Sequence, residues 1–219
     1  MENVFEIKEQ RPIAPVGWLE TSLPKNVMMR LQNYIETAKK DDIQKTIKKD
    51  LAGNISKSLS LEDTDDWFFR YILLEFIKQF NISYPTYVPT ISMITVDAPY
   101  CLNNFWVNFQ KQHEFNPMHT HNGIFSFVIW VKIPTEWREQ HALPISANSI
   151  IPRASDFEFH YTTMMGNVMN HPYLLDKESE GGMLFFPANL IHQVYPFYNC
   201  DEERVSISGN IWLDTTVRQ

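Results

Sequence analysis

The sequence predicts a mainly β fold with helices confined to its N-terminal part, which is an α+β class. From about Tyr87 onward, short runs of aromatic and β-branched residues are separated by Pro, Asn and Gly, a pattern typical of a β-sandwich or barrel. Before that point, apolar residues recur at helical spacing. The chain has 219 residues, of which 44% are hydrophobic and 14% aromatic, so it can bury a large core. At roughly 150 residues per domain, we expect one large domain with an appended element.

Two helices are predicted in the N-terminal part. The first begins near Ser22, which suits an N-cap, with Pro24 in the first turn and apolar residues at positions 27, 31, 34 and 35. The second covers residues 67–80, follows the acidic pair Asp65 and Asp66, and is apolar on all sides, so we expect it to be buried. We therefore expect residues 1–85 to form a helical and loop region that packs on a β domain of residues 86–219.

Six strands are predicted in the second part of the chain. They cover residues 90–96, 105–109, 125–131, 157–161, 182–186 and 205–212. The long connection at about 134–180 is an insertion that holds the fourth of these strands and a part that can cover a site. Glycine is scarce, and we expect Gly123, Gly181 and Gly182 to lie in tight turns.

Composition and charge exclude several classes of protein. The 26 acidic and 19 basic residues give a net charge of −7, which argues against a general nucleic-acid binder. No apolar run reaches the roughly 18 residues that a membrane span needs, and the first ten residues lack the apolar core of a signal peptide. The two cysteines, Cys101 and Cys200, cannot form a disulfide framework, so we expect a reducing, cytoplasmic compartment. The sequence indicates no oligomeric state.

Histidines suggest where the chemistry lies. His119 and His121 form an H-x-H pair directly before a predicted strand, and in extended backbone both side chains share a face. Two imidazoles at that spacing can chelate one divalent metal ion. A bare H-x-H pair is more typical of two partly exposed loop histidines, so the spacing alone favours that interpretation over a metal site. His192, among apolar neighbours after the Phe186-Pro187 turn, would by itself suit a core or capping histidine.

An arginine and a serine begin the last predicted strand on one face. Arg204 and Ser206 are two residues apart, and an arginine beside a hydroxyl is a good receiver for a carboxylate. In isolation, the acidic residues just before Arg204, namely Asp201, Glu202 and Glu203, favour a surface ion pair instead.

Taken together, these motifs resemble the 2-oxoglutarate/Fe(II)-dependent oxygenases, most closely their prolyl-4-hydroxylase-like branch. The resemblance runs from about Thr86 to the C-terminus, with the order and spacing of the motifs intact. It rests on Trp106-Val107-Asn108, on Asn116 to His121, on Ser126 to Trp130, on Gly181 to Pro187, on His192 and on Arg204 to Asn210.

The resemblance implies a double-stranded β-helix, a jelly-roll or cupin-like barrel of two antiparallel sheets, here buttressed by helices. It implies that iron is held at the open end of the barrel, with His119 as the proximal ligand and His192 as the distal ligand. The far carboxylate of 2-oxoglutarate would bind Arg204 and Ser206. Trp106 or Asn108, and Trp130, would form walls of the cosubstrate pocket.

This sequence departs from the family pattern at the acidic ligand, because His121 stands two residues after His119. His121 can replace the carboxylate in a three-histidine site, which is the interpretation we favour because both imidazoles can point inward. Alternatively, His121 is the proximal ligand and Gly123 stands at the acid position, or the fold has lost iron chemistry. Zinc in the same three-histidine site is a further alternative.

The activity implied by the resemblance is a hydroxylase-type dioxygenase that uses Fe(II), 2-oxoglutarate and O₂ and releases succinate and CO₂. The substrate is unidentified: a protein or peptide side chain such as proline and a small molecule are both candidates. The alternatives are a non-catalytic or zinc-binding cupin-like module, a zinc hydrolase with Glu114 as base, and an assembly protein. Of the other histidines, we expect surface or packing roles rather than substrate contacts for His160 and His171, and surface positions for His113 and His141.

Overall fold

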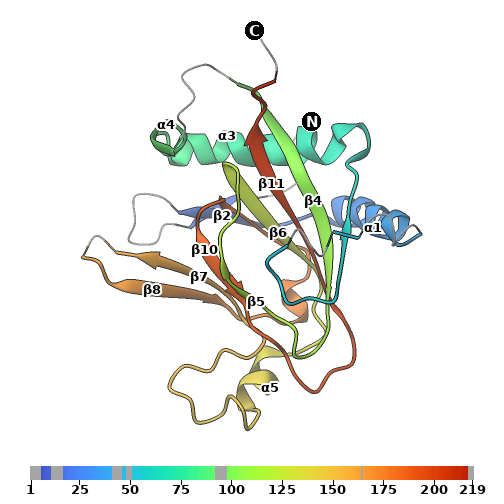
Figure 1. The fold of residues 1–219 in the computed structure, drawn as a ribbon, viewed down its shortest axis with the longest axis vertical. Coiled ribbons are helices and arrows are strands. Elements are labelled where there is room, and N and C mark those ends of the chain that lie inside the picture. Colours follow the sequence, from blue (N-terminus) through green and yellow to red (C-terminus); the bar gives the residue numbers. More distant parts are fainter. Residues whose placement is uncertain are drawn as a thin grey trace.

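Two antiparallel sheets make up the core of the protein (Figure 1). The computed structural model describes residues 6–10, 17–40, 46–47, 51–91, 98–163 and 165–216. Within these residues the large sheet has the strand order β1-β2-β9-β6-β11-β4-β3, and the small sheet has the order β5-β10-β7-β8. The strands of the large sheet are β1 (Lys8–Gln10), β2 (Trp18–Ser22), β3 (Lys57–Ser60), β4 (Tyr100–Gln110), β6 (Phe125–Lys132), β9 (Gly182–Pro187) and β11 (Arg204–Leu213). Those of the small sheet are β5 (Asn116–His119), β7 (Phe157–Thr162), β8 (Val168–Tyr173) and β10 (Ile191–Val194).

The helices lie mainly on the outer face of the large sheet. They are α1 (Lys25–Lys39), η2 (Thr64–Asp66), η3 (Phe69–Leu73), α3 (Leu74–Ser83), α4 (Tyr87–Ile91), α5 (Trp137–Ala142) and η4 (Lys177–Ser179). One apolar cluster joins α1 and α3 to that face of the sheet, for example through Phe80, whose ring lies 4.9 Å from that of Phe125. Within the described ranges, no helix combines the length and the apolar character of a membrane span.

A second apolar cluster fills part of the space between the two sheets. It combines Trp130 and Phe186 of the large sheet with Phe157 and Phe159 of the small sheet. The two sheets therefore face one another across an aromatic layer, and no described ladder closes them into a barrel. The mainly β class with buttressing helices is confirmed, in the form of two facing sheets rather than a closed barrel.

The predicted starts of both N-terminal helices need correction. Ser22 is the last residue of β2 and not an N-cap; Pro24 precedes α1, and no side chain caps it. For the second helix the cap is Asp63, whose carboxylate accepts the backbone N–H groups of Phe68 and Phe69 at 2.8 Å each. The helix also departs from the α form over η3, which is a π-helix.

Five of the six predicted strands are confirmed, within β4, β6, β7, β9 and β11. The strand predicted at residues 90–96 is wrong in its described part, because α4 extends to Ile91; residues 92–97 lie outside the described residues. The sequence did not predict β1, β2 and β3, through which the N-terminal part joins the large sheet. The insertion at 134–180 supplies α5, β7 and β8, so it builds much of the small sheet.

Candidate metal and cosubstrate site

Three histidines converge at one end of the space between the sheets. His119 ends β5 and lies directly opposite His192 in the β5–β10 ladder. His121 lies just past the end of β5, where its backbone N–H donates to the carbonyl oxygen of Ala188 at 2.8 Å. One ring nitrogen from each histidine lies within 4.8 Å of the others, and the Nε2 atoms of His119 and His121 are 3.1 Å apart. The local fold thus brings together the three residues predicted from the sequence.

A glycine shapes the turn that follows. Gly123 has a φ of +112°, which L side chains rarely adopt, and a Cβ there would lie 2.8 Å from the carbonyl oxygen of Ile211. The chain can therefore reverse direction directly after the H-x-H motif and enter β6. This confirms the tight turn predicted at Gly123.

Backbone carbonyls fix the tautomers of two of the three imidazoles. Nδ1 of His119 lies 2.6 Å from the carbonyl oxygen of Pro117, and Nδ1 of His192 lies 2.9 Å from that of Leu190. A carbonyl oxygen can only accept a hydrogen bond, so both Nδ1 atoms carry the proton. The Nε2 atom of each neutral ring is then left with a free lone pair.

An asparagine on β11 does the same for the third imidazole. Oδ1 of Asn210 lies 2.7 Å from Nδ1 of His121 and 2.8 Å from the hydroxyl of Ser126, which donates to it. His121 donates through Nδ1, and its Nε2 lone pair points toward that of His119. Two lone pairs 3.1 Å apart repel each other unless a cation lies between them. Hydrogen bonds to the far nitrogen of each ring are the usual support of metal-binding histidines.

Burial keeps the three imidazoles neutral. It lowers the pKa of His119, lowers that of His121 to about 4, and lowers that of His192 well below its ordinary value. Repulsion from the neighbouring imidazoles adds to the effect at His121 and His192. No carboxylate joins the cluster among the described residues. The donor set therefore consists of three neutral nitrogens, which suits a divalent transition metal.

A cavity of about 710 Å³ extends from the histidines along the inner face of the large sheet. Its polar lining includes Asn104 and Asn108 from β4 and Ser206, Ser208 and Asn210 from β11. The ring of Trp106, which also lines the cavity, stacks on that of His121 with the centroids 5.7 Å apart. Hydroxyl and amide groups therefore lie beside the candidate metal position, together with the apolar rings of Phe157 and Phe186.

Three of the residues predicted as cosubstrate contacts lie in one row across the sheet. Ser206 of β11 pairs with Asn108 of β4 on one side and with Trp130 of β6 on the other. The hydroxyl of Ser58 donates to Oδ1 of Asn108 at 2.7 Å. Trp106, Asn108 and Ser206 line the cavity, whereas Trp130 is buried in the cluster between the sheets, beside Phe157.

Arg204 lies one position further along the same face of β11 and is only 2% exposed. Its Nη2 donates to the carbonyl oxygen of Ser155 at 2.9 Å and to the hydroxyl of the same residue, and Phe197 packs on its guanidinium. Its Nε and Nη1 atoms are buried without a partner. Burial lowers the pKa of Arg204 to about 10, although nearby Asp156 opposes that shift. The surface ion pair considered for Arg204 is wrong, because Glu202 pairs with Lys132 at 2.6 Å instead.

The remaining histidines lie outside the cavity lining. His113 is exposed, as expected. His141 is not a surface residue, because it pairs with buried Asp156 at 2.9 Å. His160 is buried beside Asn170, and His171 packs against Trp18, so both have packing contacts.

Sequence reasoning missed two residues that support the site. Asn210 shares the polar face of Arg204, Ser206 and Ser208, and that alternation would have indicated its position. Nothing in the sequence pattern indicates Ser155, which is 49 residues from its partner Arg204.

Comparison with known proteins identifies a family for the central part of the chain. Residues 104–210 match the model of the family described as "Putative 2OG-Fe(II) oxygenase". This match includes the three converging histidines, Arg204 and Asn210, and it confirms the resemblance stated above at the level of the superfamily. None of the curated proteins compared matches the chain.

Several solved structures are distantly similar to this chain, each with a TM-score below 0.5. A 2OG-Fe(II) oxygenase family oxidoreductase from Burkholderia pseudomallei is 16% identical, with 55% of this chain and 48% of that chain covered and a TM-score of 0.37. A prolyl-4-hydroxylase from Pseudomonas putida is 12% identical, with 90% and 93% covered and a TM-score of 0.49. A prolyl hydroxylase from Trichoplax adhaerens, in complex with a hypoxia inducible factor peptide fragment, is 11% identical, with 97% and 84% covered and a TM-score of 0.46.

Proposed function

Because residues 104–210 match the family described as "Putative 2OG-Fe(II) oxygenase", we propose that the chain is a 2-oxoglutarate- and Fe(II)-dependent dioxygenase. It hydroxylates a substrate that is not yet identified and releases succinate and CO₂. The observation that carries this proposal is the convergence of three Nε2 lone pairs, on His119, His121 and His192, beside a polar cavity.

Among the interpretations of the H-x-H motif, the geometry favours the three-histidine site. His119 and His121 both direct Nε2 toward the same point, and each has its Nδ1 proton tied to an oxygen. If His119 were not a ligand, its Nε2 lone pair would face that of His121 with no cation between them, which is unfavourable. When bound there, iron would supply the activation of O₂ and the redox capacity for hydroxylation. The chain itself contributes orientation of the imidazoles and, through the surrounding aromatic layer, exclusion of water.

The cosubstrate site that we propose lies along β11. Arg204 has free buried donors on Nε and Nη1, and a carboxylate is the acceptor that best matches a guanidinium. Ser206 supplies a hydroxyl on the same face, and Trp106 and Asn108 form the adjacent walls. Trp130 pairs with Ser206 on the side opposite Asn108, and its ring packs against Phe157. A carboxylate held there is shielded from solvent, which strengthens its interaction with the cation.

The substrate class that we would test first is a protein side chain such as proline, as the prolyl-4-hydroxylase-like resemblance implies. A small polar molecule is the second candidate, because amides and hydroxyls line part of the cavity of about 710 Å³. A cytoplasmic location, expected from the two unpaired cysteines, stays a prediction.

An anaerobic titration with Fe(II) and 2-oxoglutarate tests the proposal. We expect a weak visible charge-transfer band in the wild type, its loss in His119→Ala and His192→Ala, and its weakening in Arg204→Ala. The matched control is His113→Ala, an exposed histidine outside the cluster, which should retain the band. Tight zinc binding without any band would contradict the oxygenase proposal and favour a zinc-binding module.

A further inference from the structure

Ser155 has an unusual backbone conformation next to the candidate cosubstrate site. It is fully buried, and its φ of +76° lies in the left-handed region that residues other than glycine rarely adopt. In this conformation both its carbonyl oxygen and its hydroxyl accept hydrogen bonds from Nη2 of Arg204. Strained, buried backbone of this kind concentrates at functional sites.

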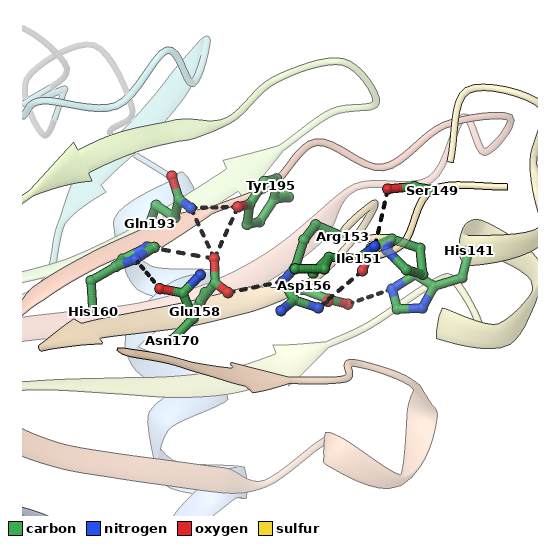
Figure 2. Close-up of polar contacts among 11 residues, drawn as sticks. His141, Ser149, Ile151, Arg153, Asp156, Glu158, His160, Asn170, Gln193 and Tyr195 are labelled. Atoms are coloured by element: carbon green, nitrogen blue, oxygen red, sulfur yellow. Dashed lines mark hydrogen bonds and ion pairs between the residues drawn. The ribbon is translucent and has the colours of Figure 1, made fainter. Parts of the chain in front are cut away.

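Backbone hydrogen bonds and ion pairs hold Ser155 from both sides. Its backbone N–H donates to the carbonyl oxygen of Pro196 at 2.9 Å, and its hydroxyl lies 3.0 Å from that of Thr135. The next residue, Asp156, pairs with His141 at 2.9 Å and lies 4.0 Å from Arg153 (Figure 2). The surrounding structure therefore fixes the conformation that aims both oxygens at Arg204.

The same segment is tied to the strand that carries His192. Glu158 is fully buried and accepts hydrogen bonds from Arg153 at 2.8 Å, Gln193 at 3.0 Å and Tyr195 at 2.9 Å (Figure 2). Gln193 directly follows His192 and lies opposite Glu158 in the β7–β10 ladder. Ser155 is thus part of a rigid connection between the metal-side strand and Arg204.

The two contacts of Ser155 with Arg204 are made by neutral oxygens, although Asp156, the next residue, interacts electrostatically with the cation. A guanidinium has five N–H donors. Ser155 takes the two on Nη2, and the three on Nε and Nη1 are buried without a partner. None of the ion pairs between described residues includes Arg204. A neutral acceptor such as Ser155 orients the Arg204 cation without competing with an incoming anion. A carboxylate at the position of Ser155 would instead pair with Arg204 and take the place of that anion.

We propose that Ser155 is a positioning residue for the cosubstrate, which holds Nη2 of Arg204 so that the Nε and Nη1 donors are presented to the far carboxylate of 2-oxoglutarate. This inference rests on the proposed function. It concerns a residue that lies in the insertion and that carries no sequence motif. A purely structural role for Ser155 predicts instead that its loss lowers stability and affects all ligands alike.

The experiment measures ligand binding rather than turnover, with Mn(II) at saturation as the metal probe. The dissociation constants of 2-oxoglutarate and of pyruvate, which lacks the far carboxylate, are measured for the wild type, Ser155→Ala and Ser155→Gly, together with melting temperatures. The control is Ser146→Ala, a buried serine in the same connection whose described hydrogen bonds do not involve Arg204.

We expect both Ser155 variants to weaken 2-oxoglutarate binding about tenfold while leaving the pyruvate and Mn(II) constants unchanged, because each removes the hydroxyl contact to a charged donor. Ser155→Gly should melt at a higher temperature than Ser155→Ala, because glycine accepts the positive φ. The proposal would be overturned if the affinity of the two variants for 2-oxoglutarate fell in proportion to their melting temperatures. It would also be overturned if pyruvate binding weakened as much as 2-oxoglutarate binding. A wild type that binds 2-oxoglutarate with no effect of Ser155 overturns this inference alone. A wild type that binds Mn(II) but not 2-oxoglutarate overturns the proposed function and this inference with it.

Discussion

The side-chain oxygen of Asn210 lies 2.7 Å from Nδ1 of His121 and determines which nitrogen of that imidazole faces His119. His121 is the residue that replaces the expected acidic ligand. Because it lies beyond the end of β5, no strand ladder orients it as the β5–β10 ladder orients His119 and His192. Its orientation therefore depends on a side-chain contact from β11.

Asn210→Ala should weaken metal binding. Loss of the hydrogen bond frees the ring of His121 to rotate, and removal of such a supporting contact typically costs about 10- to 100-fold in metal affinity. Competition titration with a chelating dye measures the effect. The control is Asn104→Ala, which changes the asparagine opposite Asn210 in the β4–β11 ladder and should alter affinity less than about twofold. Equal affinity of the wild type and Asn210→Ala would show that His121 is oriented by other means.

Arg204→Met should abolish 2-oxoglutarate binding at little cost to the stability of the ligand-free protein. The substitution removes a buried cation that has free donors and no ion pair among the described residues, and replacing buried charge by an apolar side chain is often neutral or stabilising. We expect the free energy of unfolding in urea to change by less than about 1 kcal/mol. A large destabilisation would indicate that Arg204 serves the fold rather than a ligand.

The stability of the metal-free protein should contain a component that depends on Asp156. Burial raises the pKa of Asp156 to about 6 in the folded state, although His141 and Arg153 oppose the shift. Between pH 4 and 6 the folded state therefore binds more protons than the unfolded state, so this component of stability is lost as the pH rises through 6. A shift of about two units corresponds to roughly 3 kcal/mol.

Asp156→Asn removes that component. The free energy of unfolding of the variant, relative to the wild type, should rise from pH 4 to pH 6 and then level off. The control is Asp201→Asn, which removes a carboxyl at an exposed position. A difference that stays flat from pH 4 to pH 6 for Asp156→Asn would mean that its pKa is not raised.

Gly123→Ala should destabilise the turn that follows His121. The added Cβ meets the backbone oxygen of Ile211 at 2.8 Å in addition to an unfavourable φ of +112°. We expect a loss of about 2 kcal/mol or more, together with weaker metal binding. Gly166→Ala is the matched control: its φ is +80°, but nothing lies within 4 Å of the added Cβ, so only the backbone cost of about 1 kcal/mol applies. Equal losses for both variants would exclude the steric contribution.

Phe80→Ala tests whether the N-terminal helices and the sheet form one cooperative unit. Phe80 is fully buried and contacts Phe125 and Phe185 of the large sheet. Its truncation should cost about 3 to 5 kcal/mol and lower the midpoint of a single unfolding transition. The exposed Ile82 of the same helix is the control, since Ile82→Ala should cost under about 1 kcal/mol. A separate early transition in Phe80→Ala would contradict buttressing.

The parts of the fold that the sequence predicted correctly are those where apolar and polar residues alternate regularly over several neighbouring positions. Ile207 and Ile211 alternate with polar residues on β11, and this period of two identified the strand and the face that Arg204 and Ser206 share. Strand β3 has no such signal, because it is four residues long and its partner β4 lies about 50 residues away. The cap at Asp63 was missed because the acidic pair Asp65 and Asp66 stands closer to the helix, and only the turn of η2 brings Asp63 to the free N–H groups.

The candidate site was predictable where the motif lies on a strand or next to one. His119, His192, Arg204 and Ser206 were placed by motif spacing, and the structure brings them to the inner face of the sheets. The contact between Ser155 and Arg204 was not predictable, because it depends on a left-handed serine inside a long connection.

Strand β11 is paired on both sides, with β4 and with β6, and it carries Arg204, Ser206, Ser208 and Asn210 on one face. The opposite face carries Val205, Ile207, Gly209 and Ile211. A single inserted or deleted residue within the strand would exchange these two faces, turning the four polar side chains into the apolar layer beneath the helices. The number of residues from Arg204 to Asn210 is therefore under a constraint that does not apply to the surrounding loops, because adding a residue to a loop leaves the two faces of β11 in place.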